Sequence, residues 1–290
     1  MKFSGACFIL FTLFFSADGL FGFFDPSWNT LRVTFGLNIF SSKVFAKMPL
    51  TRHDAEVAGF KQIGDNNQCS GDFQGFRYLT NRDPAVITIY DVKGYVAGIQ
   101  TSFAENTMKS AEAKAWFKQH PMFTTEHLPL NASDNYHTLT AYLVDPNIIC
   151  TTGRTAKQFE DEAAGIDLYL KNGTNNILIP KQQSDIGNTN WTLGKCFPSM
   201  GVHYWYATSE NMNCNYFQPF FLLYNHKKLT GFGLAALGYF DSYRYEHPGK
   251  AVFGKFMKII PNCLNKAVDD IGGLSTMHVY MNAKPWNLAC

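Results

Sequence analysis

The chain has 290 residues, of which 46% are hydrophobic and 16% aromatic, and its formal net charge is only +2. This length is enough for a large hydrophobic core, divided into two lobes. The weak charge and the scattered lysines exclude the strong positive field that nucleic acids or anionic membranes attract, so we expect neither as a partner.

The first 19 residues have the pattern of a secretory signal peptide. Lys2 precedes an apolar run from about Ala6 to Phe15, and small residues follow up to Gly19. The run is shorter than the roughly 20 residues that a transmembrane helix needs, and no later stretch reaches that length. We therefore predict cleavage after Gly19, a secreted extracellular protein and no membrane span. An N-terminal membrane anchor is the alternative.

Hydrophobic patterns along the rest of the chain predict mainly short strands. The segment 31–40 alternates apolar and polar residues, which is typical of a half-buried strand. A histidine among aromatic residues stands in another strand, 201–206. Further strands or hairpins are expected in 84–103, 136–144, 165–180, 219–240 and 274–281.

Few helices are expected between these strands. Thr51 and Asp54 have the spacing of a capping box and predict a helix over 52–58. Similar signals predict helices at 108–119, after Thr155, and over 250–260, where apolar residues share one helical face. The expected fold class is thus mainly β, antiparallel and sandwich-like, with a few short helices.

Landmarks of the first half recur in the second half in the same order. The sequence after Cys69, Gly75–Tyr78, corresponds to Gly201–Tyr204 after Cys196. Three later pairs continue the series: Tyr90 and Tyr224, Tyr142 and Tyr280, and Cys150 and Cys290. This order predicts an internal duplication, with a first β-rich lobe at 20–152 and a second at 153–290. Coincidence among common strand residues is the alternative.

Cysteines and sequons fit an oxidising compartment. Six cysteines follow the predicted signal peptide, and their even number favours three disulfide bonds. The duplication predicts the pairs Cys69–Cys150, Cys196–Cys290 and Cys214–Cys263. Three N-x-S/T sequons, at Asn131, Asn172 and Asn190, are typical of a glycoprotein.

Catalytic motifs are absent from the sequence. There is no G-x-S-x-G elbow, no phosphate-binding loop and no local histidine pair such as H-E-x-x-H. A metal site can only be assembled in space, and His203, His247 and His278 in the second lobe are its candidates. Met277 and Met281 flank His278, and imidazole with thioether suits copper.

The plan of two secreted lobes is similar to that of the copper-dependent peptide and catecholamine monooxygenases. The clustered histidine motifs of that family are missing here, so the resemblance transfers no residue roles.

Aromatic residues are candidates for ligand contact. Trp205, Tyr204 and Trp286 would line a groove for a glycan or a small hydrophobic molecule, although packing in the core is the alternative for each. The leading hypothesis is a secreted, disulfide-bonded glycoprotein that acts as an extracellular binding or structural protein, with an unknown ligand and no cofactor. The alternative is an extracellular copper-type oxidoreductase with its site in the second lobe.

Overall fold

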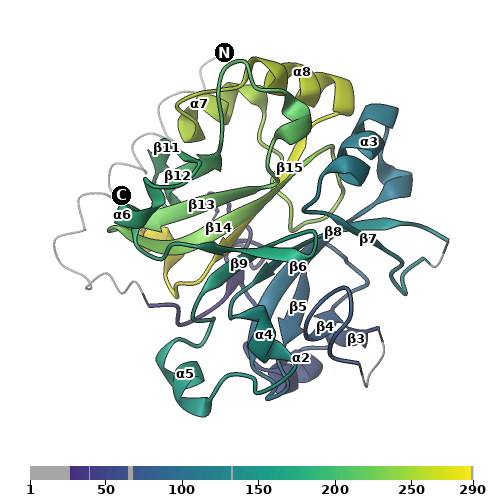
Figure 1. Ribbon diagram of the computed structural model, residues 1–290, viewed down its shortest axis with the longest axis vertical. Helices are drawn as coiled ribbons and strands as arrows, with labels where there is room; N and C mark the ends of the chain where they lie inside the picture. The colour runs from purple at the N-terminus through teal and green to yellow at the C-terminus, as the bar shows by residue number, and fades with distance from the viewer. Residues whose placement is uncertain (1–26, 39, 65–67, 132, 289) are drawn as a thin grey trace.

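The computed structural model of the protein describes residues 27–38, 40–64, 68–131, 133–288 and 290. The predicted signal peptide lies outside these residues. The described chain is mainly antiparallel β structure in two sheets with few short helices (Figure 1), which confirms the expected class. Both sheets contribute to one large hydrophobic core, an arrangement compatible with a β-sandwich.

Eight of the described strands form the first sheet. Seven of them follow the order β10 (Asn175–Ile179), β9 (Leu168–Asn172), β8 (Tyr136–Tyr142), β6 (Val96–Ala104), β5 (Ile87–Tyr90), β4 (Phe76–Leu79) and β3 (Lys61–Ile63). The eighth, β7 (Thr124–Glu126), pairs with β8.

Seven strands within the described ranges form the second sheet. Their order is β11 (Trp191–Phe197), β12 (Gly201–Tyr206), β13 (Phe220–Asn225), β14 (Lys228–Leu237), β15 (Leu274–Tyr280), β1 (Arg32–Val33) and β2 (Ala46–Lys47).

The described helices are short. Their bounds are α2 (Arg52–Val57), α3 (Ala111–Gln119), α4 (Pro146–Ile149), α5 (Ala156–Asp161), α6 (Gln183–Ile186), α7 (Phe253–Phe256) and α8 (Asn262–Ile271), with single helical turns η1 (Glu105–Thr107), η2 (Cys214–Tyr216), η3 (Lys250–Val252) and η4 (Pro285–Asn287). The predicted caps are present: the Thr51 hydroxyl accepts from the N–H of Asp54, and Thr155 with Gln158 forms a complete capping box.

The two sheets share one strand order. Strands β3, β4, β5, β6 and β8 build most of the first sheet, and β11 to β15 build most of the second. The last two strands of each sheet come from the other part of the chain. In the first sheet β9 pairs with β8, and in the second sheet β1 pairs with β15. Strands β1 and β2 belong to the range 20–152 and β9 and β10 to the range 153–290, so each sheet takes strands from both predicted lobes.

Local geometry also matches between the sheets. Gly75, immediately before β4, and Gly201, the first residue of β12, have φ angles of 99° and 104°. A Cβ on either glycine would crowd the carbonyl oxygen of the tyrosine opposite, Tyr90 or Tyr224, so both positions favour glycine for its conformation and its size. The register of each sheet shifts immediately before that tyrosine.

The inner faces of the sheets are joined by aromatic side chains. The ring of Phe103 on β6 lies 4.7 Å from the ring of Phe240 and 5.5 Å from that of Tyr245, both from the segment after β14. The hydroxyl of Tyr245 is 2.6 Å from the hydroxyl of Thr101, so this buried polar group is satisfied within the core.

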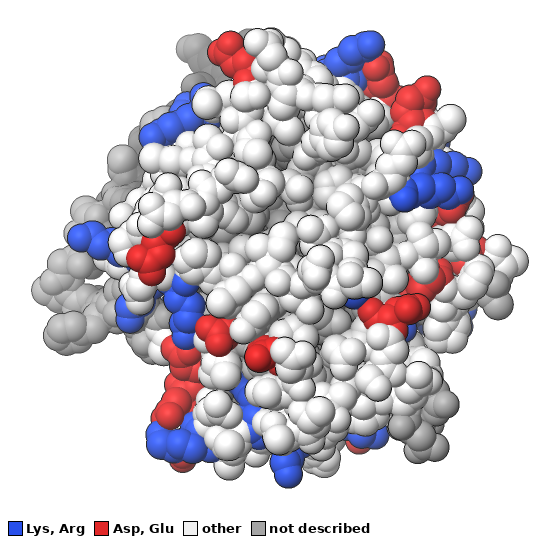
Figure 2. Space-filling model, viewed as in Figure 1, with Lys and Arg blue, Asp and Glu red and all other residues white. Residues whose placement is uncertain are grey.

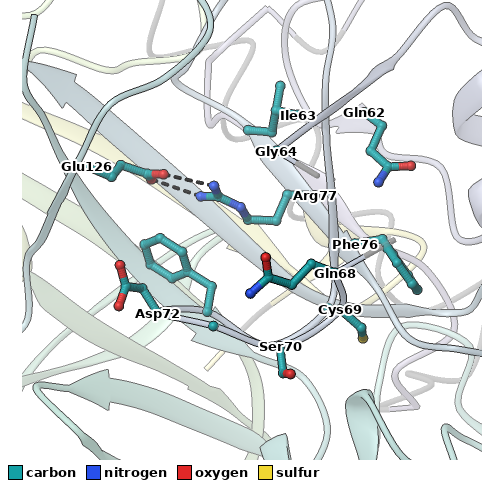
Figure 3. Close-up of a pocket in the computed structure, with 13 residues that line it drawn as sticks. Gln62, Ile63, Gly64, Gln68, Cys69, Ser70, Asp72, Phe76, Arg77 and Glu126 are labelled. Carbon is teal, nitrogen blue, oxygen red and sulfur yellow. Dashed lines mark hydrogen bonds and ion pairs between the residues drawn. The ribbon is translucent and has the colours of Figure 1, made fainter. Parts of the chain in front are cut away.

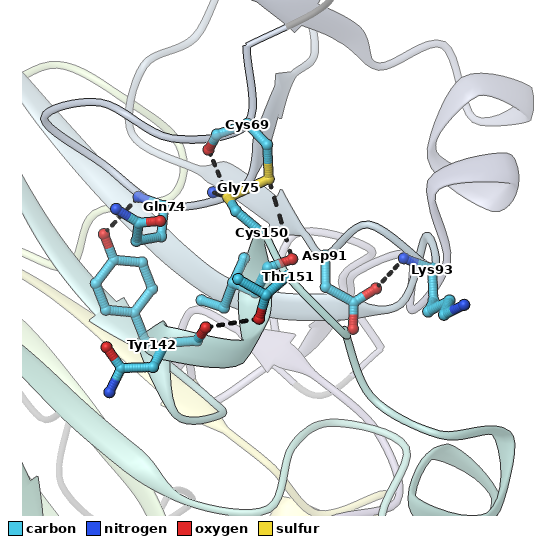
Figure 4. The surroundings of a disulfide bond; sticks show 10 residues. Cys69, Gln74, Gly75, Asp91, Lys93, Tyr142, Cys150 and Thr151 are labelled. Atoms are coloured by element: carbon cyan, nitrogen blue, oxygen red, sulfur yellow. Dashed lines mark hydrogen bonds between the residues drawn. A yellow bond between two sulfur atoms is a disulfide. The ribbon is translucent and has the colours of Figure 1, made fainter.

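Three disulfide bonds are formed within the described residues, with the pairing that the repeated spacing predicted. Cys69–Cys150, Cys196–Cys290 and Cys214–Cys263 have Cα–Cα distances of 5.5, 5.9 and 5.7 Å. Figure 4 shows the first of them, which fixes the segment before β4 beside the end of α4. The third joins η2 to α8.

The strand predicted over 31–40 is much shorter than expected. It ends at Val33 because Thr34 takes a left-handed conformation with φ of 72°, and the chain turns away from the sheet. Leu37, on the apolar face of the predicted strand, is consequently 70% exposed rather than buried. The turn directs the backbone N–H of Phe35 to the carboxylate of Glu246.

The helix predicted over 250–260 is also shorter. η3 and α7 end at Phe256, and Met257 is extended, with ψ of 139°. A further helix, α8, follows Pro261 and was not predicted, although its apolar residues share the face that packs on the core: Cys263, Leu264, Ala267, Val268 and Ile271.

Charged side chains do not gather on the face drawn in Figure 2. Basic and acidic residues of both signs are interspersed around its margin, and its centre is uncharged. In the described ranges, no helix has the length and apolar character needed to cross a membrane.

Candidate ligand-binding site

A cavity of about 210 Å³ lies between the second sheet and the segment that carries α7 and α8. Its walls are mostly apolar and rich in aromatic rings. The aromatic members are Phe35, Trp205, Phe217, Phe221, Phe253 and Phe256. Clefts of this kind, with a few polar groups among apolar walls, are typical of sites for small molecules.

Strand alternation decides which side chains reach this cavity. His203 and Trp205 on β12 line it, whereas Tyr204 points to the opposite face and packs edge-on against Tyr224 at 5.3 Å. Phe221 on β13 lies over Gly233 of β14, where a Cβ would overlap its ring. Gly233 is therefore required for the position of this aromatic wall.

The strongest polar feature of the cavity is a buried pair, Glu246 and His278. Oε2 of Glu246 lies 3.0 Å from Nδ1 of His278, and the two side chains are only 15% and 7% exposed. Oε1 accepts from the N–H of Phe35 at 2.6 Å and from the N–H of His278 at 3.2 Å. Oε2 also accepts from the hydroxyl of Thr276 at 2.8 Å. Four donors therefore surround one carboxylate.

The other nitrogen of His278 has no such partner. Nε2 is buried and makes no hydrogen bond with any described residue. The cost of an unsatisfied buried polar atom is about 1–3 kcal/mol, so an exception of this kind needs an explanation.

His203 stands beside this pair. Its ring centroid is 6.2 Å from that of His278, and its Nδ1 lies 3.1 Å from the carbonyl oxygen of Lys195. Burial, with a smaller contribution from the neighbouring His278 ring, lowers the pKa of His203 to about 3. His203 is consequently neutral in the folded protein at physiological pH.

His247 lies at the margin of the cavity. Its side chain stacks on Tyr239 with a centroid distance of 4.0 Å, and its Nε2 is 3.0 Å from the carbonyl oxygen of Phe240. The three histidines chosen from the sequence thus line one cavity. The described residues nevertheless contain no group of three or more His, Cys, Asp or Glu side chains placed to hold a metal ion.

The methionines near the histidines differ from those expected. Met277 and Met281 flank His278 in sequence but do not line the cavity, and Met200 and Met257 do. Among the aromatic candidates only Trp205 lines it. Trp286 is 38% exposed elsewhere, beneath the guanidinium of Arg32 at 5.4 Å.

The corresponding face of the first sheet carries a polar pocket of about 200 Å³ (Figure 3). Arg77, which matches His203 in strand position, donates to both oxygens of Glu126 at 2.9 and 2.8 Å. The hydroxyl of Thr138 on β8 donates to Glu126 at 2.6 Å, as that of Thr276 on β15 donates to Glu246. Each sheet thus places on this face one glutamate that accepts a hydrogen bond from a threonine. In the first sheet this glutamate also forms an ion pair with Arg77.

The predicted glycosylation sites differ in exposure. Asn131 and Asn190 are exposed, whereas Asn172 is half-buried at the end of β9 and its side-chain oxygen is enclosed.

The chain matches no protein-family model, no curated protein and no solved structure.

Proposed function

We propose that the protein is a secreted, disulfide-bonded glycoprotein that binds a small apolar molecule in the cavity lined by Trp205, Phe221 and His278. The observation that carries this proposal is an aromatic-lined space of about 210 Å³ containing a buried, unpaired imidazole nitrogen. A concave, mostly apolar space with a few polar groups is the usual form of a small-molecule site.

The size of the cavity indicates the size of the ligand. An apolar cavity of roughly 150 Å³ binds benzene. The larger volume here suits a bicyclic aromatic compound or one of similar size.

Secretion is supported by the bonding of all six cysteines of the described chain into disulfides, which persist in oxidising compartments. Exposure of Asn131 and Asn190 is compatible with glycans at both sequons. Amino-terminal sequencing of the protein secreted by eukaryotic cells tests this part, and we expect Leu20 as the first residue. Retention of Met1 in the mature chain would exclude cleavage.

We also infer that the two halves derive from an internal duplication. The shared strand order supports it, and so do pairings that recur in the two sheets. Gly98 on β6 lies opposite Tyr142 on β8, and Gly231 on β14 lies opposite Tyr280 on β15.

Copper binding is the second candidate function, favoured by one specific observation. His203 and His278 both have Nδ1 beside an oxygen acceptor, which is how metal-ligating histidines are usually oriented. Met200 and Met257 line the same cavity and offer thioether ligands. Elemental analysis of the secreted protein decides this: stoichiometric copper supports an oxidoreductase, and metal-free protein of full thermal stability excludes it.

Calorimetric titration with naphthalene tests the binding function. We expect saturable one-to-one binding to the wild type and a change in tryptophan fluorescence that is lost in Trp205→Phe. The matched variant Met257→Trp fills the cavity with an indole ring, so it should lose binding while its thermal midpoint stays the same or rises. Absence of saturable binding, or equal binding by the filled variant, would contradict the proposal.

A further inference from the structure

We propose that the ligand is a neutral aromatic compound with one hydrogen-bond donor, a hydroxyl or ring N–H group, which binds Nε2 of His278. This inference rests on the proposed binding function and names the chemical class of its ligand.

The tautomer of His278 follows from its partner. A carboxylate only accepts hydrogen bonds, so the Nδ1 that lies 3.0 Å from Glu246 must carry the hydrogen. In neutral imidazole the other nitrogen is then an acceptor. Nε2 therefore offers a lone pair, and no described residue donates to it.

The carboxylate itself is not available to a ligand. Glu246 accepts hydrogen bonds from Phe35, from Thr276 and from both the side chain and the backbone of His278. These four donors use the acceptor capacity of the carboxylate. A ligand must therefore bind to Nε2 of His278, and it must do so with a hydrogen-bond donor. A site built to bond a donor discriminates strongly against analogues that lack one, because the buried acceptor is then left unpaired.

The rings around the two histidines favour a flat ligand. The planes of Trp205 and Phe221 lie at 12° and 25° to that of His203 and at 33° to each other, so the three packed rings form one aromatic side of the cavity. Phe221 and Phe35 flank His278 with ring centroids at 5.0 and 5.8 Å. Aromatic ligands pack against such rings in offset or edge-on arrangements.

The charges near the cavity favour a neutral ligand. None of the described residues that line it is Lys or Arg, so an anion finds no partner. Glu246 is already bonded to four donors, and the other titratable groups around His278 are His203, His247 and Tyr280. None of these three supplies a free carboxylate or a fixed charge. A buried ammonium ion would have no free carboxylate, and burying an unpaired charge is costly.

The first sheet shows the same position satisfied from within the chain. There the guanidinium of Arg77 supplies the donors, bonding Glu126 through two nitrogens. In the second sheet the position of Arg77 is taken by His203, which donates nothing to the cavity's carboxylate. Glu246 receives its side-chain nitrogen donor from His278 instead, and Nε2 of that imidazole is the acceptor that we assign to the ligand's donor.

Matched ligands test this class without altering the protein. Calorimetry with 2-naphthol and 2-methylnaphthalene compares a hydroxyl with a methyl group of similar size on the same ring system. We expect 2-naphthol to bind about tenfold more tightly, the value of one buried hydrogen bond, although it is the more water-soluble compound. In His278→Phe the ratio should fall to about one or below.

Each outcome separates the ligand class from the binding function. Equal affinity of both compounds for the wild type overturns the donor requirement and leaves the cavity as an apolar binding site. Tighter binding of 2-naphthylmethylammonium than of 2-naphthol overturns the neutral class. If none of the three compounds binds, the proposed function itself fails. Should His278→Phe not fold, the comparison of ligands on the wild type still decides.

Discussion

Glu246 holds His278 twice, through the side-chain Nδ1 at 3.0 Å and through the backbone N–H at 3.2 Å. The same carboxylate bonds the N–H of Phe35, which is 211 residues away in the sequence. One side chain therefore ties β15 to the segment that follows β1 and also sets the orientation of the imidazole in the cavity.

Replacing Glu246 by Gln should destabilise the protein. The amide places an NH2 group where an oxygen accepts hydrogen bonds, so at least one buried donor loses its partner. We expect a loss of about 1–3 kcal/mol in the free energy of unfolding, measured by denaturant titration. Glu160→Gln on the exposed surface of α5 is the control and should change stability by less than about 0.5 kcal/mol. Equal effects of both changes would remove the structural role assigned to Glu246.

Gly233→Ala should damage the cavity. The added methyl group overlaps the Phe221 ring, which must move toward the space that the ligand needs. We expect a loss of about 1–3 kcal/mol in stability, with a large loss of naphthalene affinity by calorimetry. Gly249→Ala is the matched control, because a Cβ there meets no heavy atom within 4 Å. Unchanged affinity in Gly233→Ala would place the ligand elsewhere.

Stability should fall in mild acid because of His203. Burial lowers its pKa to about 3 in the folded state, against about 6.5 in the unfolded chain, so the unfolded state binds more protons between these values. The contribution is complete above pH 6.5 and is lost as the pH falls toward 3, by up to about 1.4 kcal/mol per pH unit. Chemical denaturation at a series of pH values should show a shallower decline in His203→Phe. His120, whose pKa burial lowers to about 4, acts in the same direction and stays in both proteins. Parallel curves would show that His203 is not buried as described.

The bond Cys214–Cys263 should matter for ligand binding. It attaches η2 to α8, and Leu264, the next residue, lines the cavity. Replacing both cysteines by Ser removes a constraint over 49 residues, worth about 4 kcal/mol in the chain-entropy model as an upper value. We expect weaker naphthalene binding and faster amide hydrogen exchange in α8. The pair Cys69→Ser and Cys150→Ser, at a distance from the cavity, should lower stability and leave affinity almost unchanged. The reverse pattern would contradict this role.

The exchanged strands should hold a cut chain together. No disulfide of the described chain joins residues before 151 to residues after it. A protease site inserted between the exposed Thr151 and Thr152 therefore produces two fragments without a covalent link. Because β1 pairs with β15 and β9 pairs with β8, we expect them to elute together in gel filtration until denaturant is added. Separate elution in native buffer would show that the halves are independent lobes.

Much of the fold could be predicted from local patterns. Apolar runs bounded by turn residues located β5, β6, β8 and β13 to β15, which are buried on both faces. The order of landmarks predicted the disulfide pairing. Thr34 could not be predicted, since its left-handed conformation serves a contact with a distant segment. The pairing of β1 with β15 and of β9 with β8 could not be predicted either, because a short sequence pattern does not show which distant strand will be the partner.

The site was predictable only in part. The histidines were found by residue type, whereas of the three aromatic candidates only Trp205 lines the cavity. Glu246 gave no signal as a partner of His278, because it is one acid in an irregular segment. Its four hydrogen bonds come from two distant parts of the chain, Phe35 and β15. No sequence pattern marked Gly233 either, because glycine is required there only to leave space for the ring of Phe221 on the neighbouring strand.

The most direct test of the central claim is a crystal structure of the protein with 6-bromo-2-naphthol, located by the anomalous signal of bromine. The account predicts bromine density in the cavity, in contact with Trp205 and Phe221 in its lining. It also predicts the naphthol oxygen about 2.7–3.0 Å from Nε2 of His278. Bromine at another site, or a naphthol oxygen turned away from His278, would contradict the assignment.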